Sequence, residues 1–222
     1  MFFKSDIARY KKWRKIGIQL NDKIIDKIPK ELILQAARDL RMLGKGNVLV
    51  FDSEDETSYL MDRAIYDAKI DGKWFIEVYI EQYSKDDCLT NNEKRLLEAM
   101  RKSFYSLFII DEIKHGKGVH LIDVFSEGEL FLTDIGFSFT AKRGLLIATR
   151  VISIDDLNFT GGCACVFEKK HLEELKGNFI RLFEKKKGMM SWAEMMRKYS
   201  YYFFRKMRQF GIPISLEHPY GK

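Results

Sequence analysis

The sequence predicts an α+β protein with helices at both ends and a small β domain between them. Five short apolar runs, rich in β-branched and aromatic residues, lie within residues 103–169 and are separated by Gly-bearing breaks. Such runs are typical of a small antiparallel β-sheet or an SH3-like barrel. Apolar patterns with helical spacing lie on both sides. We therefore expect an N-terminal helical region at 1–102, a small β domain at 103–169 and a C-terminal helical segment at 170–222.

The N-terminal region shows the patterns of several helices. An apolar stripe around Trp13 predicts a first helix that ends near Gly17. Pro29 suits a first helical turn, and it predicts a second helix that runs to about Leu43. The run at 74–83 fits a strand by its alternation and a helix by its spacing, and its helical neighbourhood favours a helix.

Three capping boxes mark predicted helix starts. In this motif a Ser or Thr hydroxyl caps the helix and a Glu three residues later reaches back to the capping residue. The three pairs are Ser53–Glu56, Thr90–Glu93 and Ser191–Glu194. The last pair opens a helix whose apolar side chains recur every three or four residues up to Phe210. A further stripe predicts a helix from Leu172 to near Gly188.

The β-rich stretch contains five candidate strands. They are FYSLFIIDEI at 104–113, GVHLIDVF at 118–125, ELFLTDI at 129–135, LLIATRVISI at 145–154 and FTGGCACVFE at 159–168. The first run could instead extend the preceding helix, which would leave four strands. Gly161 and Gly162 interrupt the last run and predict a bulge or bend there.

Composition excludes several classes of protein. With 46% hydrophobic and 14% aromatic residues the chain can bury a substantial core, so global disorder is excluded. No apolar run approaches the ~20 residues that cross a bilayer, and the N-terminus lacks the apolar core of a secretory signal. The 3 cysteines are too few for a disulfide framework, so a reducing cytoplasm is the expected location.

The net charge of +6 is unevenly distributed along the chain. Lys and Arg exceed Asp and Glu by 7 in residues 1–50 and by 8 in residues 169–222, whereas the acidic residues are in excess by 7 in residues 51–100. Basic ends that dock on an acidic middle explain this pattern without a ligand. A basic surface for an anionic partner such as nucleic acid is the functional alternative.

The chain carries no complete catalytic or ligand-binding motif. Cys163 and Cys165 lack the further ligands of a zinc site, so two small buried residues on one strand face are the simpler interpretation. The four His share no ligand spacing, and the acidic cluster at 52–56 is better explained by helix capping than by a calcium loop. Phosphate-binding loops and nucleophile elbows are also absent. We therefore predict no cofactor and no metal, and no catalytic residue can be assigned.

The C-terminal helix offers the most distinctive surface, because its aromatic side chains extend beyond one stripe. Packing against the rest of the chain is the simplest explanation, and self-association is the main functional alternative because aromatic residues and Met are enriched at interfaces. Membrane-surface binding and base stacking are further alternatives. The predicted interaction surface comprises Trp192, Arg197, Tyr199, Tyr201, Tyr202, Phe204, Arg205 and Arg208.

From about Leu60 to Glu168 the chain resembles an uncharacterised bacterial and archaeal group related to SEC-C motif-associated proteins. The matching segments are YLMDRAIYDAKIDGKWFIEVYIEQY, LTNNEKRLLEAMRKSFYSLFIIDEI and GVHLIDVFSEGELFLTDIGFSFTAKRGLLIATRV. The group's strand with a central Asp, its Gly turn and its late Arg correspond to Ile122-Asp123-Val124, Gly128 and Arg150. Its Cys-rich zinc-binding tail is absent, since no cysteine follows Cys165. The resemblance implies a module without an assigned activity.

Asp123 and Arg150 are either a functional pair or structural residues, and a turn hydrogen bond or a structural ion pair is the preferred interpretation. The leading functional hypothesis is a non-enzymatic cytoplasmic binding or assembly module, dimeric through its last helix or bound to a protein partner. The alternative is a nucleic-acid-binding protein that uses the β module as platform and the basic terminal segments as phosphate contacts. An enzyme with an unfamiliar site is a third hypothesis.

Overall fold

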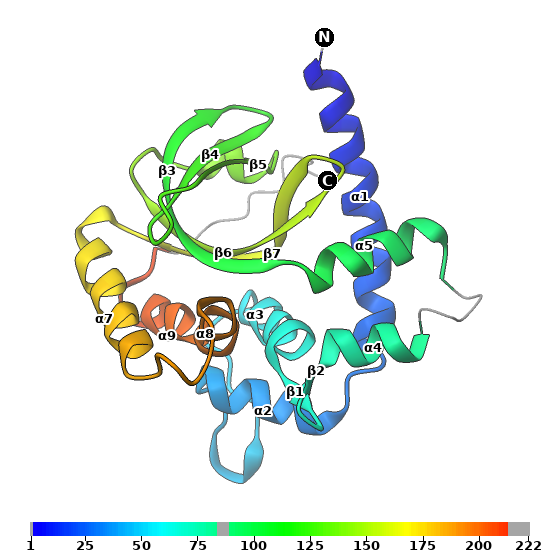
Figure 1. Ribbon diagram of the computed structural model, residues 1–222, viewed down its shortest axis with the longest axis vertical. Helices are drawn as coiled ribbons and strands as arrows, with labels where there is room; N and C mark the ends of the chain where they lie inside the picture. The colour runs from blue at the N-terminus through cyan, green and yellow to red at the C-terminus, as the bar shows by residue number, and fades with distance from the viewer. Residues whose placement is uncertain (1, 84–88, 213–222) are drawn as a thin grey trace. The chain divides into compact units, whose positions relative to one another are not determined.

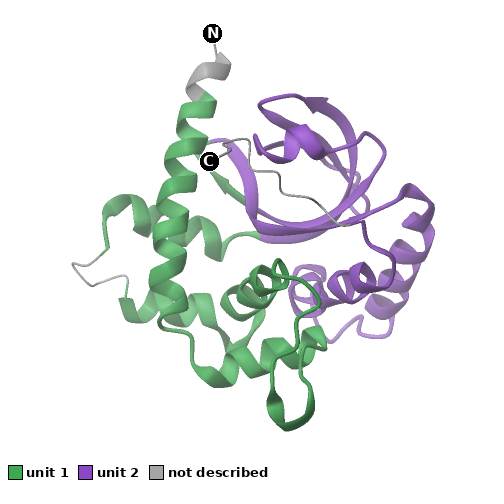
Figure 2. Cartoon of the chain, turned by 180° about the vertical axis from the view of Figure 1, so that it is seen from behind, with its two compact units in different colours: residues 1–103, 152–155 green, residues 104–151, 156–222 purple. Residues whose placement is uncertain are grey.

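The computed structural model describes residues 2–83 and 89–212 of the chain. These divide into two compact units, drawn in different colours in Figure 2. Unit 1 comprises residues 1–103 and 152–155, and unit 2 comprises residues 104–151 and 156–222. The predicted boundaries near residues 102 and 169 remain predictions.

Unit 1 is built mainly from helices. They are α1 (Phe2–Ile25), α2 (Lys30–Leu40), α3 (Glu56–Asp62), α4 (Phe75–Tyr83) and α5 (Asn91–Arg101), with the 3-10 turn η1 (Lys45–Asn47) and the π-helical turn η2 (Arg63–Asp67). The strands β1 (Lys69–Ile70) and β2 (Lys73–Trp74) form a small antiparallel pair. The run after residue 74 is therefore a helix, as its neighbourhood predicts.

The helix α1 does not end near Gly17, as predicted, but continues for two more turns to Ile25 (Figure 1). The reason is tertiary, because α1 packs on α5 at this point. A Cβ added at Gly17 would lie 3.6 Å from Leu96 Cδ2, so the glycine serves close helix packing rather than termination.

Two further helix boundaries differ from the prediction. The helix α2 ends at Leu40 rather than Leu43, because Arg41 adopts a left-handed conformation with φ of 59°. Ser53 does not form a capping box, since α3 begins only at Glu56 and has no side-chain cap. The Glu56 carboxylate instead accepts a hydrogen bond from the Asp52 N–H at 2.8 Å.

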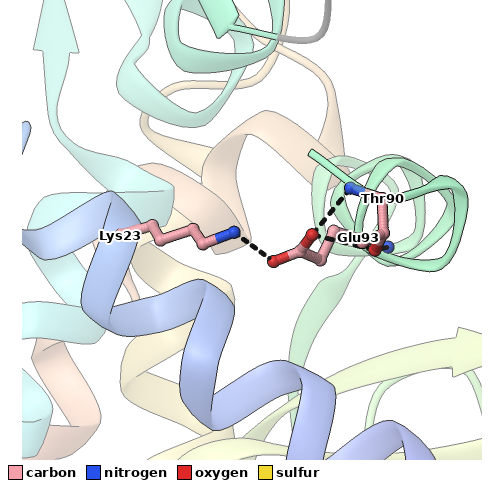
Figure 3. A network of polar contacts seen from close by, with 3 residues as sticks. All are labelled: Lys23, Thr90 and Glu93. Carbon is pink, nitrogen blue, oxygen red and sulfur yellow. Dashed lines mark hydrogen bonds and ion pairs between the residues drawn. The ribbon is translucent and has the colours of Figure 1, made fainter. Parts of the chain in front are cut away.

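The predicted capping box at Thr90 is confirmed (Figure 3). The Thr90 hydroxyl accepts from the Glu93 N–H at 3.2 Å, and the Glu93 carboxylate accepts from the Thr90 N–H at 2.7 Å. Its other oxygen lies 2.7 Å from Lys23 Nζ of α1. Burial acts to raise the pKa of Glu93, but the hydrogen bonds from Lys23 and Thr90 outweigh it and hold this pKa below its usual value.

Asp155 belongs to unit 1, although it directly follows a long strand (Leu146–Ile154) whose first residues belong to unit 2. Arg9 Nη1 of α1 donates to its backbone carbonyl at 2.7 Å, and the Arg95 guanidinium of α5 pairs with its carboxylate. Arg9 and Arg95 therefore bind residues 152–155, a segment that lies far from both of them in the sequence.

Unit 2 contains a closed five-stranded barrel, apart from residues 152–154 at the end of one strand, which are assigned to unit 1. Its strands are β3 (Phe104–Lys114), β4 (Gly118–Asp123), β5 (Glu129–Thr133), β6 (Leu146–Ile154) and β7 (Leu157–Phe167), in the order β3-β4-β5-β7-β6. The α+β fold with a small barrel is thus confirmed, and the helical alternative for the first run is wrong. The pair β5 and β7 runs parallel, whereas β3 is antiparallel to both β4 and β6. This Greek-key order is that of an OB-type barrel.

The barrel interior is filled by alternate apolar side chains. Phe108, Val119, Leu121 and Leu132 are fully buried in it. The short helix α6 (Phe137–Thr140), between β5 and β6, adds the side chain of Phe137 to the same cluster. Residues that alternate with these along β4 and β5 must therefore point outward.

Between the barrel and residue 212, the last residue that the structure describes, unit 2 has three helices. They are α7 (Leu172–Glu184), which follows the turn η3 (Lys169–His171), α8 (Trp192–Tyr199) and α9 (Tyr201–Phe210). The capping box at Ser191 is confirmed. The single helix predicted from Ser191 to Phe210 is divided at Ser200, whose hydroxyl donates to the Arg197 carbonyl and thereby competes with the helical backbone.

Candidate functional site

Side chains on β3, the β3–β4 turn, β4, β5 and the segment between β5 and β6 form two aromatic pairs, and three cations lie close to them in space or in the chain. We call this set the barrel surface, and its members are Lys114, His115, His120, Phe131, Phe139, Lys142 and Arg143. All of them belong to unit 2.

The first aromatic pair lies across β4 and β5. The register places His120 opposite both Glu112 of β3 and Phe131 of β5. The His120 and Phe131 rings are 4.9 Å apart between centroids, and Lys114 Nζ lies 5.8 Å from the Phe131 ring. Glu112 is 3.6 Å from His120 Nε2 and 3.9 Å from Lys114 Nζ. One apolar ring is thus bordered by a lysine, an imidazole and a carboxylate.

The second pair lies where the β3–β4 turn meets α6. His115 and Phe139 have ring centroids 6.3 Å apart, and Phe139 is 56% exposed. Ser138 fixes this arrangement, because its hydroxyl accepts from the Gly116 N–H at 2.9 Å and donates to the Ile135 carbonyl at 2.7 Å. Since Phe137 points into the barrel, Phe139 is turned away from it. The two pairs are linked through the chain, because Lys114, which lies near the Phe131 ring, directly precedes His115.

The cations Lys142 and Arg143 lie on the segment between α6 and β6. Hydrogen bonds in both directions tie this segment to β3: the Gly144 N–H donates to the Ile110 carbonyl at 2.8 Å, and the Ile110 N–H donates to the Leu145 carbonyl at 2.9 Å. A register irregularity between Ile110 and Glu112 frees Asp111, which pairs with Arg143 at 3.1 Å. Both cations are exposed, and they follow Phe139 by three and four residues in the chain.

The side chains of this surface have the chemistry needed to bind a ligand. Aromatic faces stack on planar ligands, and neighbouring cations attract phosphate or carboxylate groups. Within residues 2–83 and 89–212 no group of three or more His, Cys, Asp or Glu is arranged to hold a metal ion. In the same part of the chain no helix combines the length and apolarity needed to cross a membrane.

The predicted interaction surface on the C-terminal helices is only partly accessible. Trp192 packs in an aromatic cluster, with ring centroids 5.0 Å from Phe125, 5.8 Å from Phe179 and 4.8 Å from Phe183. Phe204 is 2% exposed, so this ring belongs to the interior rather than to an accessible surface.

The other members of that predicted surface are half-buried. The Arg205 guanidinium lies 4.3 Å from the Tyr201 ring, and Arg208 lies 5.3 Å from the Phe204 ring. Burial raises the pKa of the Tyr202 hydroxyl. Arg197 and Tyr199 complete the set. The role of these residues in an interaction stays a prediction.

The structure defines the surroundings of Asp123 and Arg150. Asp123 Oδ1 accepts from the Phe125 and Ser126 N–H groups at 2.8 and 2.9 Å, which confirms the turn hydrogen bond. Arg150 is 1% exposed and lies 5.7 Å from the Tyr105 ring.

The cysteine prediction is correct for one residue only. Cys165 is fully buried, but Cys163 is partly exposed. Cys163 follows Gly162, whose φ of 123° interrupts the regular strand, and the neighbouring residues are also accessible. Cys88 and His218 lie outside the described residues.

A family model of unknown function (DUF7986) matches residues 4–217. The chain belongs to this family. No curated protein and no solved structure matches it. Membership in DUF7986 agrees with the expected uncharacterised family, whereas a relation to SEC-C motif-associated proteins stays a prediction.

No sequence pattern singled out the barrel surface. The available signal was Phe139 followed closely by Lys142 and Arg143, next to a β-rich run that contains Phe131 and His120. Phenylalanine is common in cores, and its exposure depends on the direction in which the short helix faces.

Proposed function

We propose that the protein binds single-stranded nucleic acid at the barrel surface. The observation that carries this proposal is Phe139, which is 56% exposed beside His115, with Lys142 and Arg143 close in sequence. Single strands bind where aromatic rings stack on bases and cations track the phosphates. The second pair, His120 and Phe131, offers a further stacking position bordered by Lys114.

The position of this surface within the barrel supports the same ligand. In OB-type barrels the face of the second and third strands and the loop between the first two strands bind oligonucleotides or oligosaccharides. Here those elements are β4, β5 and the turn that contains His115. A fold by itself does not assign a function, so the proposal depends on the side chains. Lys114 beside the Phe131 ring, and two cations a few residues after Phe139 in the chain, favour a phosphate-bearing oligonucleotide over a neutral sugar.

Fluorescence anisotropy with a labelled oligonucleotide tests this function. A strand of about 12 nucleotides suits the site size of one OB-type barrel. Phe139→Ala should weaken binding by about 5- to 150-fold, because loss of one stacked base costs about 1–3 kcal/mol. Phe104→Ala is the matched control, since Phe104 is a 44% exposed phenylalanine at the opposite end of β3.

Two results would reject the proposal. One is the absence of binding by the wild-type protein to DNA or RNA strands at low salt. The other is an equal effect of Phe139→Ala and Phe104→Ala, which would indicate that the barrel surface is not the contact site.

Self-association through the C-terminal helices is a second candidate. The stacking of Arg205 on Tyr201, both half-buried, supports it because such residues are enriched at interfaces. Light scattering at high micromolar concentration should then report a dimer, and a strict monomer would exclude this candidate.

A further inference from the structure

The helix α1 carries an unbroken basic segment. Residues 7–21 contain five Lys and Arg and no Asp or Glu. The cations are Arg9, Lys11, Lys12, Arg14 and Lys15. A surface helix usually mixes both signs of charge, so this composition needs a physical explanation.

The two faces of α1 differ sharply in environment. Tyr10, Trp13, Leu20 and Ile24 are at most 7% exposed and form the buried face. Lys11, Arg14 and Lys15 are all exposed, and their spacing of three and four residues places them together on the opposite face. These three side chains lie within about one turn of the helix, and we call them the basic row.

Among the described residues the three cations of this row have no internal partner. Lys11, Arg14 and Lys15 form no hydrogen bond or ion pair with any residue in the described part of the chain. Arg9 contrasts with them, because it pairs with Asp6 at 2.6 Å and also binds the Asp155 carbonyl. The charge of the row is therefore available to an external anion.

The burial of the apolar face decides which anion fits. A membrane-surface helix inserts its apolar face into the lipid, but the apolar face of α1 is used for packing within unit 1. What remains exposed is a set of positive charges with one apolar neighbour, the 57% exposed Ile18. The charges suit the regularly spaced phosphates of a nucleic-acid backbone, and a single exposed apolar residue is too little to anchor a helix in lipid.

We propose that the basic row of α1, formed by Lys11, Arg14 and Lys15, is a second nucleic-acid contact that binds the phosphate backbone without reading sequence. The inference rests on the proposed function, and it assigns the two regions different tasks. The barrel surface stacks bases, and the row supplies charge. The affinity contributed by the row must then fall with salt, because binding releases counterions from the strand.

The salt dependence of binding tests this division. We compare wild-type protein with a triple variant, Lys11→Gln, Arg14→Gln and Lys15→Gln, by anisotropy on an oligo(dT) of about 20 nucleotides. Each single-strand phosphate contact contributes about 0.7 to the slope of log K against log salt, so the slope should decrease by about 2. Circular dichroism should show unchanged helix content and melting, since the three side chains are exposed.

The matched control removes the same charge elsewhere in unit 1. Lys30→Gln, Arg38→Gln and Lys45→Gln change three exposed cations of α2 and η1 that also form no ion pair within the described residues. This variant should change the slope by less than about 0.5, because it alters only the net charge. Phe139→Ala should lower affinity and leave the slope as in wild type.

The outcomes separate the two proposals. If wild-type protein binds and the α1 variant keeps the wild-type slope, or matches the control variant, the basic row is not a contact and the proposed function stands. If wild-type protein binds no strand at any salt concentration, both are overturned. A slope lowered only in the α1 variant supports the inference.

Discussion

Substitution of Gly118 by Ala should destabilise the barrel, because β4 approaches β5 too closely there for a side chain. Gly118 pairs with Lys114 of β3 and with Thr133 of β5. An added Cβ would overlap the Leu132 carbonyl oxygen, and it would lie 2.9 Å from the Leu132 carbonyl carbon and 3.0 Å from Thr133 Cα. All three atoms belong to the backbone, so no side-chain rotation relieves the overlap.

The size of the effect follows from this geometry. Ordinary contact begins at 3.4 Å and the added Cβ would lie only 2.0 Å from the Leu132 carbonyl oxygen, so these two atoms must move apart by about 1.4 Å. Overpacking of this kind costs about 1–3 kcal/mol, and weakening of one strand hydrogen bond adds about 1 kcal/mol. We expect a loss of about 3 kcal/mol in the free energy of unfolding. For a chain of this length that corresponds to a melting temperature lower by about 6–12 °C.

Thermal unfolding followed by circular dichroism checks this expectation. Gly177→Ala is the control, because Gly177 lies within α7 and a Cβ added there meets no atom within 4 Å. That substitution should stabilise the protein by up to about 1 kcal/mol, since alanine favours a helix. If the Gly118→Ala variant melts at the wild-type temperature, β4 and β5 do not approach each other at Gly118 as closely as described.

Two further predictions concern stability. The pKa of Glu93 is lowered in the folded state, so the Glu93 carboxylate stabilises the fold above the ordinary pKa of 4.5, and this stabilisation is lost as the pH falls from 4.5 through the folded pKa. Glu93→Gln should therefore flatten the decrease in the urea midpoint between about pH 5 and pH 3. If the variant's urea midpoint depends on pH as that of the wild type does, the role of Lys23 is contradicted. Trp192→Ala should lower the free energy of unfolding, measured with urea, by about 3 kcal/mol at constant m-value, because it removes the ring that packs among Phe125, Phe179 and Phe183. A loss below about 0.5 kcal/mol would show that this cluster is not packed as described.

Local signals in the sequence predicted the elements, whereas tertiary contacts set several of their limits. The capping boxes at Thr90 and Ser191 are confirmed, because a cap needs only residues three positions apart. The same residue pattern at Ser53 fails, since the Glu56 carboxylate binds another backbone N–H. Gly17 looked like a helix end, but it lies where Leu96 approaches α1.

The barrel surface depends on information that the sequence does not contain locally. Glu112, His120 and Phe131 lie next to one another across three strands because of the strand register and an irregularity in β3. The exposure of Phe139 results from the burial of Phe137 in the barrel. The basic character of the N-terminus was visible in the sequence, and the structure adds which of its cations are unpaired.

The assignment of residues 152–155 to unit 1 has a consequence for experiments on isolated parts of the chain. A fragment that ends at residue 103 lacks Asp155, so Arg9 and Arg95 would lose the acceptor that they share. A fragment that starts at residue 104 carries that acceptor without either donor. The chain therefore passes between the two units more than once. Neither unit is a continuous stretch of sequence, so neither could be moved into another protein as a single segment.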